Sequence, residues 1–81
     1  MTYTLDEKTI ERLNNDFTYH KPFGDQAERY GEIRDEAKEL AKTLVTLCPN
    51  SRELSLALTH LEEAVFYANA SIARNEKETT S

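Results

Sequence analysis

The chain has 81 residues, a mean hydropathy of −0.71 and a formal net charge of −5. A chain of this length makes one domain with a small core, and its single cysteine, Cys48, excludes a disulfide within the chain, so we expect additional stability from self-association. Because 10 Lys and Arg stand against 15 Asp and Glu, the composition argues against a general nucleic-acid binder, whose affinity comes from clustered cations.

The first predicted element is a short helix that begins near Thr4. Thr4 and Glu7 have the spacing of a capping box, in which a hydroxyl precedes a Glu by three residues. Residues 14–16, Asn-Asn-Asp, compete for backbone hydrogen bonds, so we expect the helix to end there. Apolar residues follow broadly helical spacings: Leu5, Ile10, Leu13 and Phe17.

The segment 16–25 is unusually rich in side chains that bind ligands. It contains three of the seven aromatic residues together with a His, a Lys, a Pro and a Gly. Pro22 and Gly24 favour an irregular conformation. Aromatic faces stack on flat rings and cations attract phosphates, so we expect this loop to contact a ligand. His20, next to Lys21, either faces a phosphate or is an ordinary hydrogen-bonded residue of the loop.

A long second helix is predicted from Asp25 to Cys48, just before Pro49. Asp25 suits the N-cap position, with Glu28 as the third helical residue. Apolar residues recur at spacings of three and four: Tyr30, Ile33, Ala37, Leu40, Leu44 and Leu47. These residues define a seam on one face, and the charged residues between them form a solvated face.

A third helix is predicted after Pro49, with Asn50 or Ser51 as its N-cap. Its seam repeats the same spacings: Leu54, Leu58, Leu61, Val65, Ala68 and Ile72. Two long helices joined by a tight turn form an antiparallel hairpin. More apolar residues lie outside the seam: Leu56, Ala57, Ala64, Phe66, Tyr67, Ala70 and Ala73. One neighbouring helix cannot cover all of them, so we expect other copies of the chain to do so.

The sequence therefore predicts an all-α fold: a short N-terminal helix plus a long antiparallel helical hairpin that assembles as a homo-oligomer. Residues 1–76 are expected to form a single helical domain, and residues 77–81 a disordered tail. Residues 1–7 lack the pattern of a secretory signal, and no apolar stretch approaches a membrane span. We therefore expect a soluble protein of cytoplasmic type.

No arrangement of residues suggests catalysis. Cys48 has no His nearby to activate it, and there is no Cys and His cluster with zinc spacing. Glu62 and Glu63 are adjacent, so on a helix their side chains point about 100° apart, which argues against a paired acid and base. We expect a binding protein that is not an enzyme and that needs neither cofactor nor metal.

Ordered motifs run through residues 16–76. In one-letter code they are FTYHKP (17–22), GDQ (24–26), ERY (28–30), IR (33–34), AKELA (37–41), CPNSRE (48–53), LEEAV (61–65) and ANASIARNE (68–76). Together they resemble the small anti-CBASS cyclic-oligonucleotide sponges of phages. The ordered set is far more specific than any one motif, and residues 1–15 contribute little to the resemblance.

The resemblance implies a helical homohexamer that binds cyclic dinucleotides, and in many members cyclic trinucleotides at separate sites. Such proteins sequester these second messengers without degrading them, so that the host's CBASS effector is never switched on. The expected location is the cytoplasm of the infected bacterial host. The expected partners are cyclic nucleotides and other copies of the chain, but not DNA, RNA or a membrane.

The resemblance also implies which residues bind the ligand. The Tyr of the FTYH segment stacks on a base, and Tyr19 matches it; from the residues alone, Tyr19 is as well explained as an aromatic that covers the end of the hairpin. A basic residue of the following helix lies near the ligand, and either Arg34 or Lys38 fits. Both also suit ion pairs within their own acidic helix. An Arg near the end of the last helix serves trinucleotides, and Arg74 is its counterpart.

Two other classes of function compete with this one. A helical adaptor acting on a host factor would use the apolar surface of the third helix for a protein partner. A phosphodiesterase would cleave the nucleotide, but it normally needs metal-binding carboxylates or paired histidines, which the sequence does not present.

Overall fold

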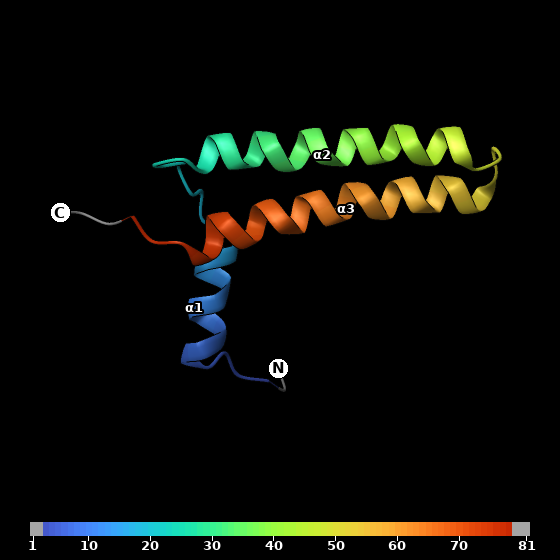
Figure 1. The fold of residues 1–81 in the computed structure, drawn as a ribbon. Coiled ribbons are helices and arrows are strands. Elements are labelled where there is room, and N and C mark those ends of the chain that lie inside the picture. The colour runs from blue at the N-terminus through green and yellow to red at the C-terminus, as the bar shows by residue number, and fades with distance from the viewer. Residues whose placement is uncertain (1–2, 79–81) are drawn as a thin grey trace.

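The computed structural model describes residues 3–78, which contain three helices and no strand (Figure 1). Helix α1 spans Glu7–Asp16, α2 spans Gln26–Leu47 and α3 spans Arg52–Asn75. Helices α2 and α3 lie side by side as an antiparallel hairpin, and α1 projects from the C-terminal end of α3 on the side away from α2. The predicted all-α fold is confirmed. The predicted tail lies partly outside the described residues, which end at residue 78.

Helix α1 begins later than the capping-box spacing predicts. Its N-cap is Asp6 rather than Thr4, and an Asp6 carboxylate oxygen accepts a hydrogen bond of 2.7 Å from the backbone nitrogen of Thr9. The backbone hydrogen bond from Thr9 lowers the pKa of Asp6, with a further contribution from the Thr9 side chain. A carboxylate at this position also interacts favourably with the positive end of the helix dipole. The helix therefore begins at Asp6 rather than at Thr4 because the Asp6 carboxylate is a stronger hydrogen-bond acceptor than the Thr4 hydroxyl.

The hairpin helices begin near the predicted residues, but their caps differ. Asp25 is the N-cap of α2, as predicted, yet its side chain makes no capping hydrogen bond. Gly24 precedes it with a φ of 57°, in the left-handed region that favours glycine. Helix α3 has Ser51 as its N-cap, and the Ser51 hydroxyl accepts a hydrogen bond of 3.1 Å from the backbone of Leu54.

The seam between α2 and α3 agrees with the predicted spacings on α3 and departs from them on α2. All six predicted seam residues of α3 are buried or half-buried. On α2, Leu40 and Leu47 are 48% and 76% exposed, whereas Ala41 is half-buried. The prediction for Leu40 and Leu47 is therefore wrong. The seam continues from Ala37 to Ala41, a spacing of four, rather than to Leu40, a spacing of three. Leu47 is the last residue of α2.

The single chain leaves most of its apolar surface open. Leu54, which is 9% exposed, is the only buried hydrophobic residue among those described. The accessible surface is 7187 Å², compared with about 5,000 Å² for a compact globular protein of this mass. The molecule is also flat, with extents of 48 × 45 × 13 Å. None of the helices in residues 3–78 is both long and apolar enough to cross a membrane.

Candidate functional site

A pocket of about 380 Å³ opens at one end of the hairpin. We call this end the junction end and define it as residues 15–30 and 66–76, together with the nearby side chain of Arg34. Three segments line the pocket: the end of α1 with the loop that follows, the first half of α2 and the second half of α3. Four of the five predicted ligand-binding residues meet here: Tyr19, His20, Arg34 and Arg74. The fold therefore brings together residues that are as far apart as 55 positions in the chain.

Three aromatic side chains line this junction pocket. Tyr19, on the loop, is 82% exposed, so its ring is accessible to a ligand. Tyr30 from α2 is half-buried, and Phe66 from α3 is exposed. Phe66 also contacts Tyr67 edge to face, with 5.3 Å between ring centroids. The helical spacings assigned Tyr30 to the seam and Phe66 to the excess apolar residues, so neither was predicted as a pocket residue.

Arg34 and Lys38 lie one turn apart on α2, and only Arg34 reaches the junction pocket; both line a second hollow described below. Within residues 3–78, neither side chain forms an ion pair, although acidic residues surround them in sequence. The alternative interpretation of these two cations as members of intrahelical ion pairs is therefore not supported. A cation without an ion-pair partner is well suited to meet a phosphate.

Arg74 has a structural role at this pocket. Its Nη1 lies 3.8 Å from a carboxylate oxygen of Asp16, and its Nη2 donates a 3.4 Å hydrogen bond to the Asp16 carbonyl. Its own carbonyl accepts a 3.0 Å hydrogen bond from the Asn15 side chain. Arg74 therefore connects the end of α1 to the end of α3. Figure 1 shows that the two helices meet at this point. An anionic ligand at this position would therefore compete with Asp16 for the guanidinium of Arg74.

His20 is hydrogen-bonded within the loop. Its Nε2 donates to the carbonyl of Asn15 across 2.8 Å, which requires a proton on that nitrogen. Thr18 donates to the carbonyl of Asn14 in the same way. Of the two interpretations of His20, the hydrogen-bonded one is observed, and this bond places Tyr19 between two residues anchored to the end of α1.

Asn69 is a further polar residue in the wall of the junction pocket. Its Oδ1 is shielded from solvent and accepts no hydrogen bond from the described residues. Buried polar atoms without partners are uncommon in folded proteins. The sequence contains a signal for this feature, because Asn69 is a polar residue within an apolar stretch of α3.

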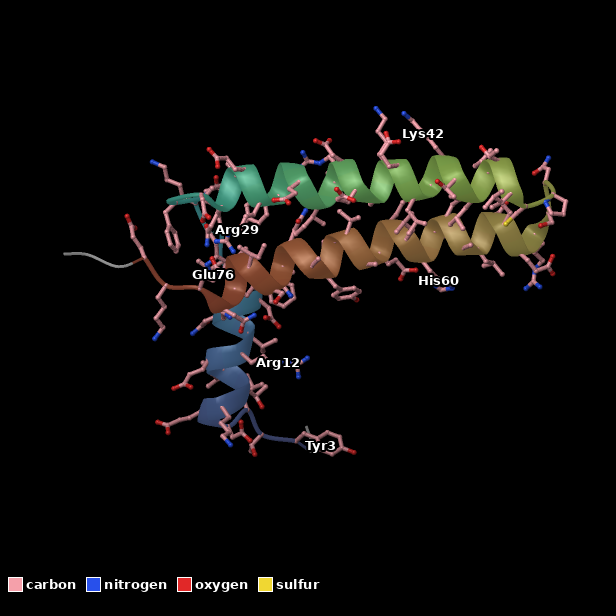
Figure 2. The ribbon with its side chains drawn as sticks, in the orientation of Figure 1. Tyr3, Arg12, Arg29, Lys42, His60 and Glu76 are labelled. Carbon is pink, nitrogen blue, oxygen red and sulfur yellow. The ribbon has the colours of Figure 1, made fainter. Side chains whose placement is uncertain are left out.

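A second polar cluster fixes the start of α2 to the end of α3 (Figure 2). Arg29 donates two hydrogen bonds to the Glu76 carboxylate, at 2.7 and 2.6 Å, and one of 3.0 Å to Asp25. Gln26, the most buried residue described, donates to Glu76 and accepts from the backbone of Phe23, both at 3.1 Å. We call Gln26, Arg29 and Glu76 the latch. The latch was not predictable from the sequence, because no local spacing connects Glu76 to α2.

The latch perturbs the acid–base properties of its charged members. Hydrogen bonds from Arg29, and then from Gln26, lower the pKa of Glu76 to about 2. The hydrogen bond to Glu76 is also the main cause that raises the pKa of Arg29. Both groups are therefore charged at neutral pH. The latch joins the start of α2, which directly follows the loop containing Tyr19, to the end of α3, and so it positions two of the segments that line the pocket.

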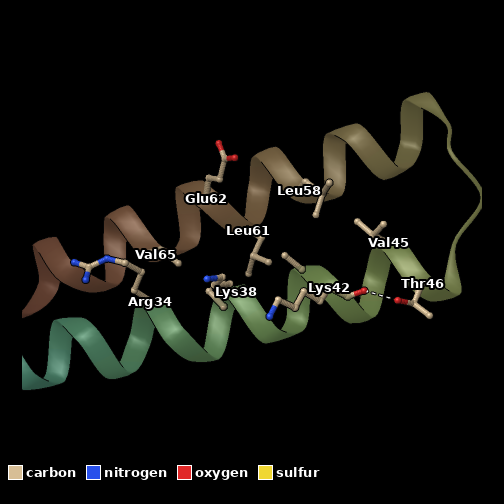
Figure 3. Close-up of a pocket in the computed structure, with 11 residues that line it drawn as sticks. Arg34, Lys38, Lys42, Val45, Thr46, Leu58, Leu61, Glu62 and Val65 are labelled. Atoms are coloured by element: carbon tan, nitrogen blue, oxygen red, sulfur yellow. Dashed lines mark hydrogen bonds between the residues drawn. The ribbon is translucent and has the colours of Figure 1, made fainter.

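A larger hollow of about 950 Å³ runs along the middle of the hairpin, which we call the mid-hairpin groove (Figure 3). Lys38 and Lys42 lie on its α2 side with Arg34, the one residue that also lines the junction pocket. Its floor is apolar and comes from both helices: Ala37, Ala41, Leu58, Leu61 and Val65. Within residues 3–78, no group of three or more His, Cys, Asp and Glu residues is placed to hold a metal ion.

Comparison with known proteins gives one match. The model of the Acb2/Tad1 hairpin domain family matches residues 9–73, which is well over half of the chain. The matched range begins inside α1 and ends two residues before the end of α3. It includes Tyr19, His20, Arg34 and Lys38, and it stops one residue before Arg74. No curated protein matches the chain, and no solved structure does.

Proposed function

Because this chain belongs to the Acb2/Tad1 hairpin family of anti-CBASS cyclic-oligonucleotide sponges, we propose that it sequesters cyclic dinucleotides, and cyclic trinucleotides at separate sites, without cleaving them. Sequestration keeps the second messenger away from the effector of CBASS, so that an infected cell does not respond. The protein would act in the cytoplasm of the bacterial host. Neither nucleic-acid polymers nor membranes are proposed as partners.

The observation that carries this proposal is the composition of the junction pocket. Tyr19, Tyr30 and Phe66 supply aromatic faces, and Arg34 supplies a cation without an ion-pair partner among the described residues. A cyclic dinucleotide presents flat purines and two phosphates, which these two kinds of side chain recognise. Stacking of one base on an aromatic side chain is typically worth about 1–3 kcal/mol.

Within the pocket we assign Tyr19 to base stacking and Arg34 to phosphate binding. Arg34 is preferred over Lys38 because it lines the same pocket as Tyr19. Lys38 projects from the same helix face one turn further on, where it can reach only a second phosphate or a ligand that extends toward the mid-hairpin groove. His20 is assigned to positioning Tyr19 through its hydrogen bond to Asn15.

Arg74 is proposed for trinucleotide binding, in keeping with its place near the end of α3. Its guanidinium is about one-third exposed and already interacts with Asp16. A trinucleotide would therefore replace part of that interaction rather than meet a free cation. Loss of trinucleotide binding in Arg74→Ala, with dinucleotide binding retained, would separate the two kinds of site.

The pocket of one chain is open, so we propose that a second copy supplies the opposing surface within a homohexamer. The support for self-association is the exposed apolar surface of the single chain, in which Leu54 is the only buried hydrophobic residue among those described. Small domains commonly obtain from oligomerisation the stability that their own core does not provide. The exposed faces of Phe66 and Tyr67 are consistent with coverage by another copy.

The proposal is tested by calorimetric titration with a panel of cyclic di- and trinucleotides, followed by denaturation of the protein and recovery of the ligand. We expect saturable binding and intact cyclic nucleotide. Recovery of linear products would indicate a phosphodiesterase. A monomer at micromolar concentration that binds none of the panel would favour the adaptor for a host protein.

A further inference from the structure

The mid-hairpin groove is an apolar channel with a positive rim. Its floor contains two alanines of α2 one turn apart, Ala37 and Ala41, which leave space beside the larger side chains of α3. The rim has three cations from α2, Arg34, Lys38 and Lys42, and one carboxylate from α3, Glu62. Lys42 contacts Glu39 at 3.2 Å on the exposed side of α2.

Helix α1 has the complementary chemistry. Its apolar residues Ile10 and Leu13, with Phe17 just after it, recur along one face, and all three are exposed. Asp6 precedes Ile10 by one turn, so it lies at the N-terminal end of that face. Lys8 and Arg12 are two residues away from Ile10 in either direction and therefore lie on the opposite side of the helix. Figure 2 shows Arg12 on this projecting arm.

The dimensions of helix and groove agree. Ten helical residues extend for about 15 Å, and the stretch of α2 that lines the groove, from Arg34 to Thr46, extends for about 18 Å. In its own chain α1 projects from the far side of α3, away from α2, as Figure 1 shows. It therefore cannot lie in the groove of the chain to which it belongs.

We propose that the mid-hairpin groove of one copy receives α1 of a second copy. The apolar face of α1 rests on the alanine floor, and Asp6 and Glu7 lie near the cations of the rim. This contact covers two apolar surfaces that the single chain leaves open, which is the source of the free energy of association. It rests on the self-association in the proposed function, whereas its test involves no nucleotide.

The direct test is a disulfide between two differently tagged chains, both with Cys48→Ser to remove the exposed native thiol. One carries Leu13→Cys, on the apolar face of α1, and the other carries Ala41→Cys, in the groove floor. We expect a mixed, reducible dimer on oxidation. The matched control replaces Leu13→Cys with Glu11→Cys, on the opposite side of α1, and should give at least fivefold less mixed dimer.

Two outcomes of this experiment would overturn the proposal. Equal yields from the Leu13 and Glu11 variants would show that α1 does not present its apolar face to the groove. Faster dimerisation of the Ala41→Cys chain with itself than with the Leu13→Cys chain would show that two grooves face each other instead. Neither outcome bears on whether the protein binds cyclic nucleotides.

A charge exchange provides an independent test by sedimentation velocity without ligand. Glu7→Lys and Lys42→Glu should each weaken association several-fold, because each places like charges at the contact. The double variant should recover most of the wild-type association. Additive weakening in the double variant, or no effect of either single change, would exclude contact between this face of α1 and the rim.

Discussion

The two ends of the helical hairpin are held together by different interactions. At the junction end, polar side chains connect all three helices: Asn15, Asp16, Gln26, Arg29, Arg74 and Glu76. At the turn end, which we define as residues 44–58, no side-chain hydrogen bond or ion pair among the described residues joins α2 to α3. There the helices meet through apolar side chains, including Leu54, the one buried hydrophobic residue within residues 3–78.

This difference is consistent with the ligand binding proposed for the junction end. A ligand pocket needs side chains at fixed positions, and hydrogen bonds constrain position more tightly than apolar contact does. The latch and the contacts of Arg74 therefore lie around Tyr19 and Arg34. Apolar contact is non-directional, so it suits the part of the hairpin that only needs to keep two helices together.

The largest effect is expected at the turn end, from Leu54→Ala. Removal of this buried side chain should lower the free energy of unfolding by roughly 2–5 kcal/mol, measured by urea denaturation at a fixed protein concentration. Leu56→Ala is the matched control, because Leu56 lies two residues away on the same helix and is 41% exposed. An equal loss in the two variants would mean that the turn end has no core of its own.

The next largest effect is expected from Tyr19→Ala at the junction end. Loss of a base-stacking contact should weaken cyclic dinucleotide binding by about 5- to 150-fold, with the oligomer unchanged. Tyr3→Ala is the control, because Tyr3 is 84% exposed, almost the same as Tyr19, and does not line the pocket. Calorimetry that gives wild-type affinity for the Tyr19 variant would remove this residue from the site.

A smaller effect should separate the two candidate cations. Arg34→Ala should weaken dinucleotide binding by about fivefold, which is the scale of one solvent-accessible charge interaction. Lys38→Ala should have a weaker effect, because Lys38 lies outside the junction pocket. Titration of both variants under the same salt conditions provides the comparison. A greater loss in the Lys38 variant would reverse the assignment.

The smallest effect concerns the latch at low pH. The pKa of Glu76 is lowered from 4.5 to about 2 in the folded chain, so its carboxylate stabilises the fold fully above pH 4.5. That stabilisation should be lost as the pH falls from about 4.5 to about 2. Glu76→Gln should remove this contribution, seen as a shallower decline of the urea midpoint over that range. Glu36→Gln, on an exposed site of α2, is the control and should retain the wild-type decline.

Much of the fold was predictable because helix periodicity is local. Every residue that the spacings on α3 assigned to the seam is buried or half-buried, and proline and serine marked the turn between the hairpin helices. The spacing on α2 was ambiguous at Leu40 and Ala41, which are adjacent, and only contact with α3 decided between them. The N-cap of α1 was also ambiguous, since Thr4 and Asp6 are both residue types that are preferred at the N-cap of a helix.

The candidate site was predictable only in part. Resemblance to the family identified Tyr19 and left Arg34 and Lys38 as alternatives, and the loop chemistry alone indicated a ligand without its identity. Tyr30, Phe66 and Asn69 were not recognised as pocket residues, because helical periodicity assigns a residue to a face but does not say what lies opposite that face.

The sequence by itself determined the helices, their apolar faces and the membership of the ordered motifs in one family, since each depends on residues close together in the chain or on motif order. Only the tertiary structure decided that Arg34 shares a pocket with Tyr19, and that Glu76 binds Arg29 and Gln26, which precede it by 47 and 50 positions in the chain. The reason is physical: the antiparallel return of α3 brings residues 66–76 beside residues 19–34, and no local spacing encodes that contact.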